Sequence, residues 1–335
     1  MQKIGLVGLG FMGKMHLRAY DSINNCEVTA IYTRSNVEDE DITQMYNGSF
    51  VTTYDDLLND DAIDIIDICL PTYLHEEFII KAANAGKHII CEKPLTLTVE
   101  SAKRILDIIR KNEVRLFVGH VLRFWPEYKK IKSYSESDKL TNIDVVHAKR
   151  LGQKPKWSNW FQHPEKSGGA LFDLHIHDID FVTYLLGEVD CVYAVGTKND
   201  IGAWDHIMTT LSFKNKSIAY VEASHRMAMK FPFTMSFRAQ SSERVVDFRF
   251  EGAENIENMQ AFNNQFTYYT NEKKSTLEVQ AEDAFQNELS YFVDCIEHTK
   301  ENTIIPLTDV LYTQFILQAI EQSLENNEKV SISQF

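Results

Sequence analysis

Short apolar runs alternate with amphipathic stretches along the first part of the chain, up to about residue 120. The apolar runs have the length of buried strands and lie at residues 4–7, 28–32, 63–69, 88–91 and 116–119. Between them, apolar side chains recur at helical spacing over residues 14–22, 54–59, 76–85 and 99–112. Strands that alternate with helices in this way predict an α/β domain with a doubly wound parallel sheet.

After about residue 120 the pattern changes to the period of two that is typical of strands with one exposed face. It covers residues 143–150, 190–197, 205–222 and 231–249, with few helical stretches between them. We therefore expect a second, α+β domain with a large, open and mainly antiparallel sheet. The predicted domains are residues 1–121 and 122–335, with a helix at about 307–324 that packs back on the first domain.

The composition is that of a globular protein, with 44% hydrophobic and 24% charged residues over 335 positions. The net charge of −14 would repel a phosphate backbone, so we expect neither nucleic acid nor an anionic membrane as a partner. No signal sequence and no apolar stretch long enough for a membrane helix is visible. The five cysteines are widely spaced and mostly lie in apolar runs, which predicts reduced, buried thiols in a cytoplasmic protein.

A glycine motif directly follows the first predicted strand and precedes a predicted helix. Gly8 permits a tight turn, Gly10 lets the backbone approach a pyrophosphate, and Gly13 lets the helix pack closely on the strand. The N-terminus of the helix offers free amides to phosphate groups. The sequence therefore predicts a Rossmann domain whose dinucleotide-binding loop comprises Gly8, Gly10, Phe11, Met12 and Gly13.

The residues after the second predicted strand bear on the choice between NAD and NADP. NAD-binding proteins usually carry an acidic residue there, which binds the ribose 2′-hydroxyl, whereas an arginine accommodates the 2′-phosphate of NADP. This chain has Thr33, Arg34 and Ser35, whose guanidinium and hydroxyl groups suit a phosphate monoester. We predict NADP as the cofactor, with NAD as the alternative because the acidic run 38–41 lies close by.

The tripeptide Glu92-Lys93-Pro94 follows the predicted strand at residues 88–91. Lys93 is then expected at the carboxyl end of a parallel strand, where open α/β sheets bind their ligands. Pro94 also permits a cis peptide bond. The alternative is an ordinary turn with a solvated lysine, because lysine is almost always exposed.

Residues 167–187 predict one helix that ends at Gly187 and carries a polar stripe. Asp173 and His177 are spaced i, i+4 on this stripe, which continues through Asp180 and Tyr184. A contact with Asp173 would raise the basicity of His177, and a basic imidazole suits the removal of a hydroxyl proton.

Two other interpretations of the stripe stay open. It fits a solvated face, which is the usual arrangement on a surface helix. It also fits a metal site formed by Asp173, His177 and Asp180, although catalytic zinc prefers a majority of histidine ligands. We favour the general base and predict no metal.

Together, these motifs resemble the Gfo/Idh/MocA family, named after glucose-fructose oxidoreductase and inositol dehydrogenase. The resemblance covers nearly the whole chain. The glycine loop matches the nucleotide fingerprint of the family, and Glu92-Lys93-Pro94 matches its signature tripeptide. Two further matches are Leu70-Pro71-Thr72 with His75, similar to a cofactor-contacting loop, and Gly168-Gly169 with Asp173 and His177, similar to the substrate-domain motif.

The resemblance implies reversible hydride transfer between a nicotinamide and a secondary alcohol of a sugar or cyclitol, in a homodimer or homotetramer built through the C-terminal sheet. It implies that Lys93 hydrogen-bonds the reacting oxygen, His177 takes its proton, and Asp173 orients the substrate or His177. The implied cofactor contacts also include Leu70, Pro71, Thr72, His75, Glu92 and Lys93.

Further candidates for substrate binding are Arg123, which follows the last strand of the first domain, and Trp157 and Trp160 before the Gly-Gly motif. The two tryptophans suit stacking on a sugar ring, but aromatic residues of this kind also form cores and interfaces. Two other functions fit the same motifs. One is a non-catalytic protein that senses nucleotides, and the other is a reductase of dihydrodiols or 1,5-anhydro-ketoses.

Overall fold

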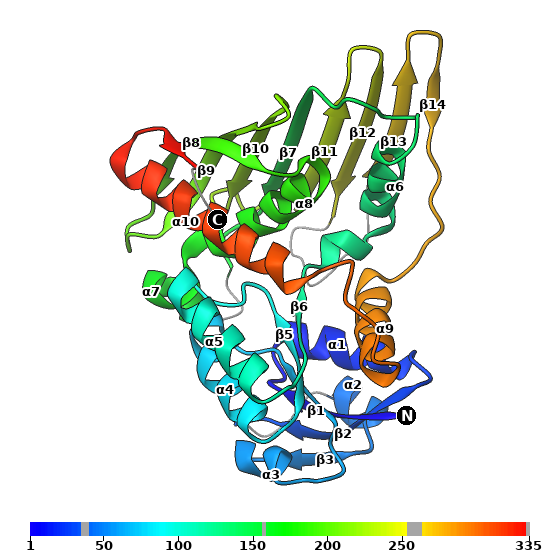
Figure 1. The fold of residues 1–335 in the computed structure, drawn as a ribbon, viewed down its shortest axis with the longest axis vertical. Coiled ribbons are helices and arrows are strands. Elements are labelled where there is room, and N and C mark those ends of the chain that lie inside the picture. Colours follow the sequence, from blue (N-terminus) through cyan, green and yellow to red (C-terminus); the bar gives the residue numbers. More distant parts are fainter. Residues whose placement is uncertain (35–39, 156–158, 253–262, 333–335) are drawn as a thin grey trace. The chain divides into compact units, whose positions relative to one another are not determined.

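The computed structural model describes residues 1–34, 40–155, 159–252 and 263–332, and Figure 1 shows its ribbon. The chain divides into two compact units. Unit 1 comprises Met1–Phe124 and Glu282–Leu311, and unit 2 comprises Trp125–Ala281 and Tyr312–Phe335. The predicted domains differ from these units in assigning residues 122–124 and 282–311 to the second domain. None of the helices in the described ranges has the length and apolar character needed to cross a membrane.

The described part of unit 1 contains a six-stranded sheet in the order β3-β2-β1-β4-β5-β6. All neighbouring strands in it are parallel, and the order reverses between β1 and β4. This arrangement confirms the predicted doubly wound sheet. The strands are β1 (Gln2–Val7), β2 (Cys26–Tyr32), β3 (Ser49–Val51), β4 (Ile65–Ile68), β5 (His88–Glu92) and β6 (Leu116–Gly119).

The helices of unit 1 connect these strands, and the last of them returns from the far end of the sequence. They are α1 (Phe11–Asp21), α2 (Glu40–Met45), α3 (Tyr54–Leu58), α4 (His75–Asn84), α5 (Val99–Lys111) and α9 (Ala284–Glu297). Helix α5 begins after Thr98, whose hydroxyl accepts the Ser101 N–H at 3.2 Å. Asp283 caps α9 in the same way by accepting the Phe285 N–H at 2.8 Å.

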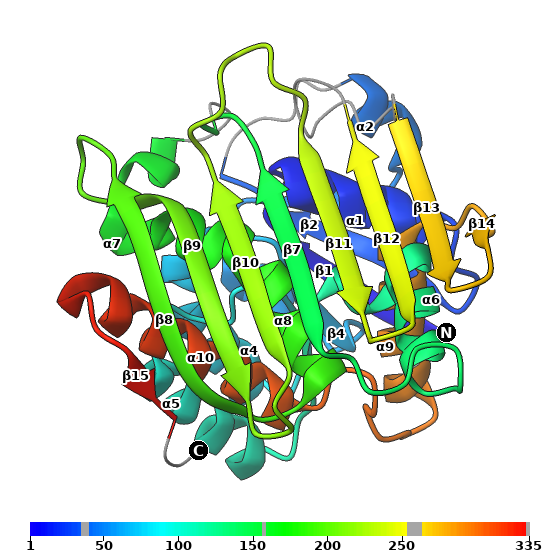
Figure 2. The same ribbon diagram turned by 90° about the horizontal axis from the view of Figure 1, so that it is seen from above.

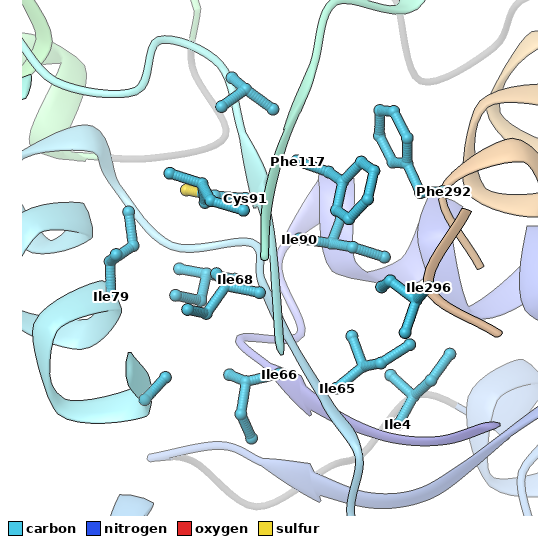
Figure 3. Close-up of a cluster of buried hydrophobic side chains, with 14 of the residues drawn as sticks. Ile4, Ile65, Ile66, Ile68, Ile79, Ile90, Cys91, Phe117, Phe292 and Ile296 are labelled. Carbon is cyan, nitrogen blue, oxygen red and sulfur yellow. The ribbon is translucent and has the colours of Figure 1, made fainter. Parts of the chain in front are cut away.

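The core of unit 1 lies on both faces of the parallel sheet, as the continuous apolar runs of its strands predict. Figure 3 shows that Ile90 and Cys91, neighbours on β5, point to opposite faces. On the face of Ile90, Phe292 of α9 packs against Phe117 with ring centroids 5.0 Å apart. Helix α9 therefore completes the core of a unit whose strands all come from the first 120 residues.

The described part of unit 2 contains a nine-stranded sheet in the order β14-β13-β12-β11-β7-β10-β9-β8-β15. Only β7 and β10 pair in parallel among these strands, which confirms the predicted mainly antiparallel sheet. The strands are β7 (Val145–Leu151), β8 (Val189–Lys198), β9 (Trp204–Phe213), β10 (Ile218–Ser224), β11 (Thr234–Gln240), β12 (Arg244–Glu251), β13 (Asn263–Thr270), β14 (Lys274–Thr276) and β15 (Val330–Ser331).

Helices of unit 2 cover one face of this sheet. Figure 2 shows α6 (Pro126–Ser135) and α8 (Ile176–Leu186) behind the strands, while no helix of the described residues crosses the near face. Helix α10 (Leu307–Asn326) passes from unit 1 into unit 2 at Tyr312. In unit 2 its Tyr312 hydroxyl accepts the Val189 N–H at 2.7 Å, which fixes the helix beside β8.

Candidate functional site

The glycine loop between β1 and α1 has the geometry that its motif predicts. Gly8 has a φ of +95°, and a Cβ there would lie 2.7 Å from the Cys69 carbonyl oxygen. A Cβ on Gly13 would lie 2.0 Å from the Gly8 carbonyl oxygen, so any side chain would push the helix off the loop. A Cβ on Gly10 would meet no atom within 4 Å. The packing of the protein therefore does not require glycine at position 10, whereas close approach of a dinucleotide would require it.

The segment after β2 carries the residues predicted to distinguish the cofactors. The Thr33 N–H donates to the Val51 carbonyl at 3.1 Å, which ties this segment to β3. Arg34 follows with an exposed side chain, so its guanidinium is accessible to an anionic ligand. Ser35 lies outside the described residues.

The segment after β4 is held by a buried histidine. The ring of His75 is 1% exposed, with Nε2 2.8 Å from the Leu70 carbonyl oxygen and Nδ1 2.9 Å from the Pro94 carbonyl oxygen. Burial lowers the pKa of His75, against the opposite effect of the hydrogen bonds to the Leu70 and Pro94 carbonyl oxygens. His75 thereby ties the Leu70-Pro71-Thr72 segment to the Lys93-Pro94 segment.

The signature tripeptide stands at the end of β5, as predicted. Glu92 is the last residue of the strand, and its Oε2 accepts the Lys93 N–H at 3.0 Å. Burial by itself would raise the pKa of Glu92, but the hydrogen bond and charge of His16, with the charge of Lys93, lower it. The Lys93–Pro94 peptide bond is cis. The Glu92 side chain is thus held inside the protein, and Lys93 is half-buried.

Three of the predicted segments therefore meet within unit 1. The glycine loop packs against the segment after β4, because a Cβ added to Gly8 would lie 3.0 Å from Leu70 Cδ2. His75 joins the β4 segment to the β5 segment. This edge holds the carboxyl ends of β1, β4 and β5, at the reversal of strand order where open sheets bind nucleotides.

The predicted single helix over residues 167–187 of unit 2 is wrong at its start. Gly168 and Gly169 have φ values of +67° and +66°, which end the short helix α7 (Pro164–Ser167). Leu171–His175 then forms a π-helical turn, and α8 starts at Ile176. A Cβ on Gly169 would lie 2.6 Å from the Trp204 carbonyl oxygen, so this position admits only glycine.

Asp173, in the π-helical turn, contacts a histidine that the sequence analysis missed. His225 follows β10, is 5% exposed and places its Nε2 3.1 Å from Asp173 Oδ2. Its Nδ1 lies 3.9 Å from Asp205 Oδ1. His225 therefore lies between two carboxylates and fixes Asp173. In the sequence, it is one histidine after a strand, with no spacing that links it to Asp173.

His175 and His177 occupy different environments. His175 is fully buried with Nε2 2.8 Å from Thr209 Oγ1, and burial lowers its pKa to about 3. His177 is partly buried in the first turn of α8. Asp180 is 1% exposed and accepts the Thr313 hydroxyl at 3.2 Å, so the stripe is not a solvated face at this position. A contact between Asp173 and His177 stays a prediction.

The candidates for substrate binding belong to different units of the chain. Trp160 stacks on Phe161 at 4.1 Å, and Phe161 meets the ring of His225 edge-on at 6.5 Å, so this pair lies near the partner of Asp173. Trp157 lies outside the described residues. Arg123 is buried in unit 1, where its Nη1 lies 2.7 Å from Asp309 Oδ2. The charge of Arg123 is therefore balanced within unit 1.

Two family models match this chain. The N-terminal domain of the Gfo/Idh/MocA oxidoreductase family, an NAD-binding Rossmann fold, matches residues 2–120, and a C-terminal domain of the family matches residues 128–243. Myo-inositol 2-dehydrogenase of Thermotoga maritima is 30% identical over 235 residues, which are 67% of this chain and 69% of that protein.

Two solved structures share the fold. Levoglucosan dehydrogenase, in complex with NADH and levoglucosan, has a TM-score of 0.82 and 23% identity over 99% of this chain and all of that one. A 3-ketoreductase from Actinomadura kijaniata, in complex with NADP, has a TM-score of 0.84 and 20% identity over 96% of this chain and 98% of that one. With both of its domains matched, the chain belongs to the Gfo/Idh/MocA family of oxidoreductases.

Proposed function

We propose that the protein is an NAD(P)-dependent dehydrogenase that transfers a hydride between the nicotinamide and a secondary alcohol, or its ketone, in a sugar or cyclitol. The convergence of the glycine loop, the His75 segment and Lys93 at one edge of the parallel sheet carries this proposal. The resemblance to a myo-inositol 2-dehydrogenase supports the substrate class. The five cysteines, all buried and free, support a cytoplasmic location.

Each proposed catalytic side chain has its own part in the reaction. When bound, the nicotinamide would accept or supply the hydride. Lys93 would hydrogen-bond the oxygen of the reacting carbon and stabilise the negative charge that develops there. His177 would hold the hydroxyl proton, and Asp173, fixed by His225, would orient the substrate.

A substrate screen tests this proposal. Sugars, inositols and their keto forms are offered with NAD, NADP and the reduced cofactors, while absorbance of the reduced nicotinamide is followed. Turnover of at least one sugar or cyclitol supports the proposal. Nucleotide binding without turnover would favour a non-catalytic sensor. Activity restricted to dihydrodiols or 1,5-anhydro-ketoses would replace sugars and cyclitols with those compounds as the substrate class.

We further propose that NADP is the preferred cofactor, because the accessible guanidinium of Arg34 follows β2. Replacing Arg34 with Ala should raise the KM for NADPH roughly 10- to 100-fold, the loss expected for a hydrogen bond to a charged group. The KM for NADH should stay nearly unchanged. Arg18→Ala, which removes another exposed arginine of unit 1, is the matched control. A wild-type preference for NADH would refute the assignment.

The uncovered face of the nine-stranded sheet supports the proposal of a homodimer or homotetramer. Large apolar side chains are exposed on its neighbouring strands β8, β9 and β10. The exposed fractions are 40% for Tyr193, 43% for Val195, 53% for Met208 and 42% for Tyr220. Val195 and Met208 stand opposite each other in the pairing of β8 with β9. Together these side chains form an apolar patch that a second copy of the sheet would bury.

Introducing charge on this patch should dissociate the oligomer, because an unpaired carboxylate is costly to bury. The double variant Met208→Asp, Tyr220→Asp should have at most half of the wild-type mass by light scattering at the same concentration. Met229→Asp, which changes an exposed methionine in a turn after β10, should keep the wild-type mass. A wild-type protein that is monomeric at every concentration would contradict the proposed assembly.

A further inference from the structure

His16 of α1 is buried between two carboxylates of neighbouring strands. Its ring is 1% exposed, with Nδ1 2.8 Å from Asp67 Oδ2 on β4 and Nε2 3.0 Å from Glu92 Oε1 on β5. An ionised carboxylate only accepts hydrogen bonds, so the ring satisfies both partners by donating from both nitrogens. The arrangement is that of one imidazolium cation between two anions, with charge-assisted hydrogen bonds on each side.

The hydrogen bonds continue beyond both carboxylates. Asp67 Oδ2 also accepts the Tyr20 hydroxyl at 2.9 Å, and Glu92 Oε2 accepts the backbone N–H of Lys93 at 3.0 Å. A continuous chain of groups therefore runs from Tyr20 to the backbone of Lys93. The side chains of Tyr20, Asp67, His16 and Glu92 are all buried, so these groups satisfy one another and not the solvent.

A metal ion is the other group that such residues could hold. Among the described residues, the donor atoms of His16, Asp67 and Cys69 lie within 4.8 Å of one another. The 2.8 Å between His16 Nδ1 and Asp67 Oδ2 is a hydrogen-bond distance, shorter than the roughly 3.3 Å between two ligands at typical zinc bond lengths. The geometry favours a hydrogen-bonded histidine.

We propose that His16 is a positioning residue for Lys93: through Glu92 it fixes the backbone from which the Lys93 side chain extends, and through Asp67 it locks the end of β4 beside the nucleotide loop. This inference rests on the proposed catalytic role of Lys93. A small shift of a catalytic group is costly, because a displacement of about 1 Å lowers a rate by roughly 100-fold.

The charge state of His16 provides a second measurement. Burial by itself lowers the pKa of His16, but the charge and hydrogen bond of Asp67 outweigh it and hold the pKa well above the usual 6.5. Because the pKa of His16 is higher in the folded than in the unfolded protein, protonated His16 contributes fully to the free energy of unfolding below pH 6.5. This contribution is lost as the pH rises through the folded-state pKa. The other titratable groups that face this network are Tyr20, Cys69, Glu92 and, across Gly119 from Glu92, Glu288 of α9.

The test compares His16→Gln, Glu92→Gln and the double variant with the wild type and with Lys93→Met. The glutamine in His16→Gln carries no charge, and its amide donates to only one of the two carboxylates. Glu92→Gln breaks the same link from the other end, so it replaces His16→Gln in the test if that variant does not fold. For each protein kcat, KM, the cofactor Kd and the free energy of unfolding between pH 6 and 9 are measured. Metal content is measured on the wild type and on His16→Gln.

We expect His16→Gln to lower kcat roughly 10- to 100-fold while the cofactor Kd changes less than about 3-fold. The double variant should be little worse than either single variant, because both break one chain. The stability advantage of the wild type over His16→Gln should shrink as the pH rises. An unchanged kcat with lower stability would reduce His16 to a structural residue, and a stoichiometric metal lost in His16→Gln would replace the proposal with a metal site. Full turnover by Lys93→Met would instead refute the proposed catalytic role of Lys93, on which this inference rests.

Discussion

Replacing Lys93 with methionine should lower kcat roughly 1,000-fold, the effect of removing a group that stabilises charge in a transition state. Lys93 follows the last residue of β5, at the sheet edge where the glycine loop and the His75 segment also end. Methionine keeps the length of the side chain but cannot donate a hydrogen bond to the substrate oxygen. The measurement is steady-state turnover of the substrate that the screen identifies.

Cofactor affinity separates this effect from a loss of folding. The Kd for NADP(H) and the Tm of Lys93→Met should stay close to wild type, because the substitution keeps the backbone N–H of Lys93 that donates to Glu92. Lys93→Arg keeps the charge with a different donor geometry and should recover only part of the rate. Equal kcat values for wild type and Lys93→Met would remove Lys93 from the mechanism.

Replacing His177 with alanine should lower kcat by roughly 100- to 10,000-fold, the range observed for the loss of a general acid or base. The pH profile of kcat/KM should lose the limb on which turnover rises as the base loses its proton. Added imidazole, a small base, is expected to restore part of the rate, which a purely structural role would not allow.

His175, two residues earlier, provides the matched control for this variant. Its ring is fully buried against Thr209, and with a pKa of about 3 it does not change its charge near neutral pH. His175→Gln should lower Tm but leave the shape of the pH profile unchanged. A pH profile that changes in His175→Gln but stays as in the wild type in His177→Ala would contradict the assignment of His177 as the base.

Local sequence patterns predicted the parts of the fold that depend on neighbouring residues. The glycine loop is one example, because Gly8 and Gly13 meet within one turn of chain. The helix predicted from residue 167 was wrong at its start, because its periodicity does not reveal that Gly169 packs against the Trp204 carbonyl. Helix α9 was missed because its apolar face matches a core made by residues far away in the sequence.

The same limit applies to the candidate site. His16 contacts carboxylates that lie 51 and 76 residues further along the chain, and no spacing rule connects them. Asp67 did offer a signal, since a carboxylate within the run Ile65-Ile66-Asp67-Ile68 must have a partner if the strand is buried. The pairing of Asp173 with His225 needed the strand register of unit 2, because β10 and the π-helical turn are separate elements.

The return of Glu282–Leu311 to unit 1 determines how late in synthesis this unit can complete its core. While the ribosome synthesises Trp125–Ala281, the apolar surface around Phe117 stays uncovered, because Phe292 and the rest of α9 have not yet been made. During that interval the nascent first unit exposes apolar surface to water, which is the condition that recruits chaperones. A recombinant fragment that stops after Phe124 would keep that surface uncovered permanently.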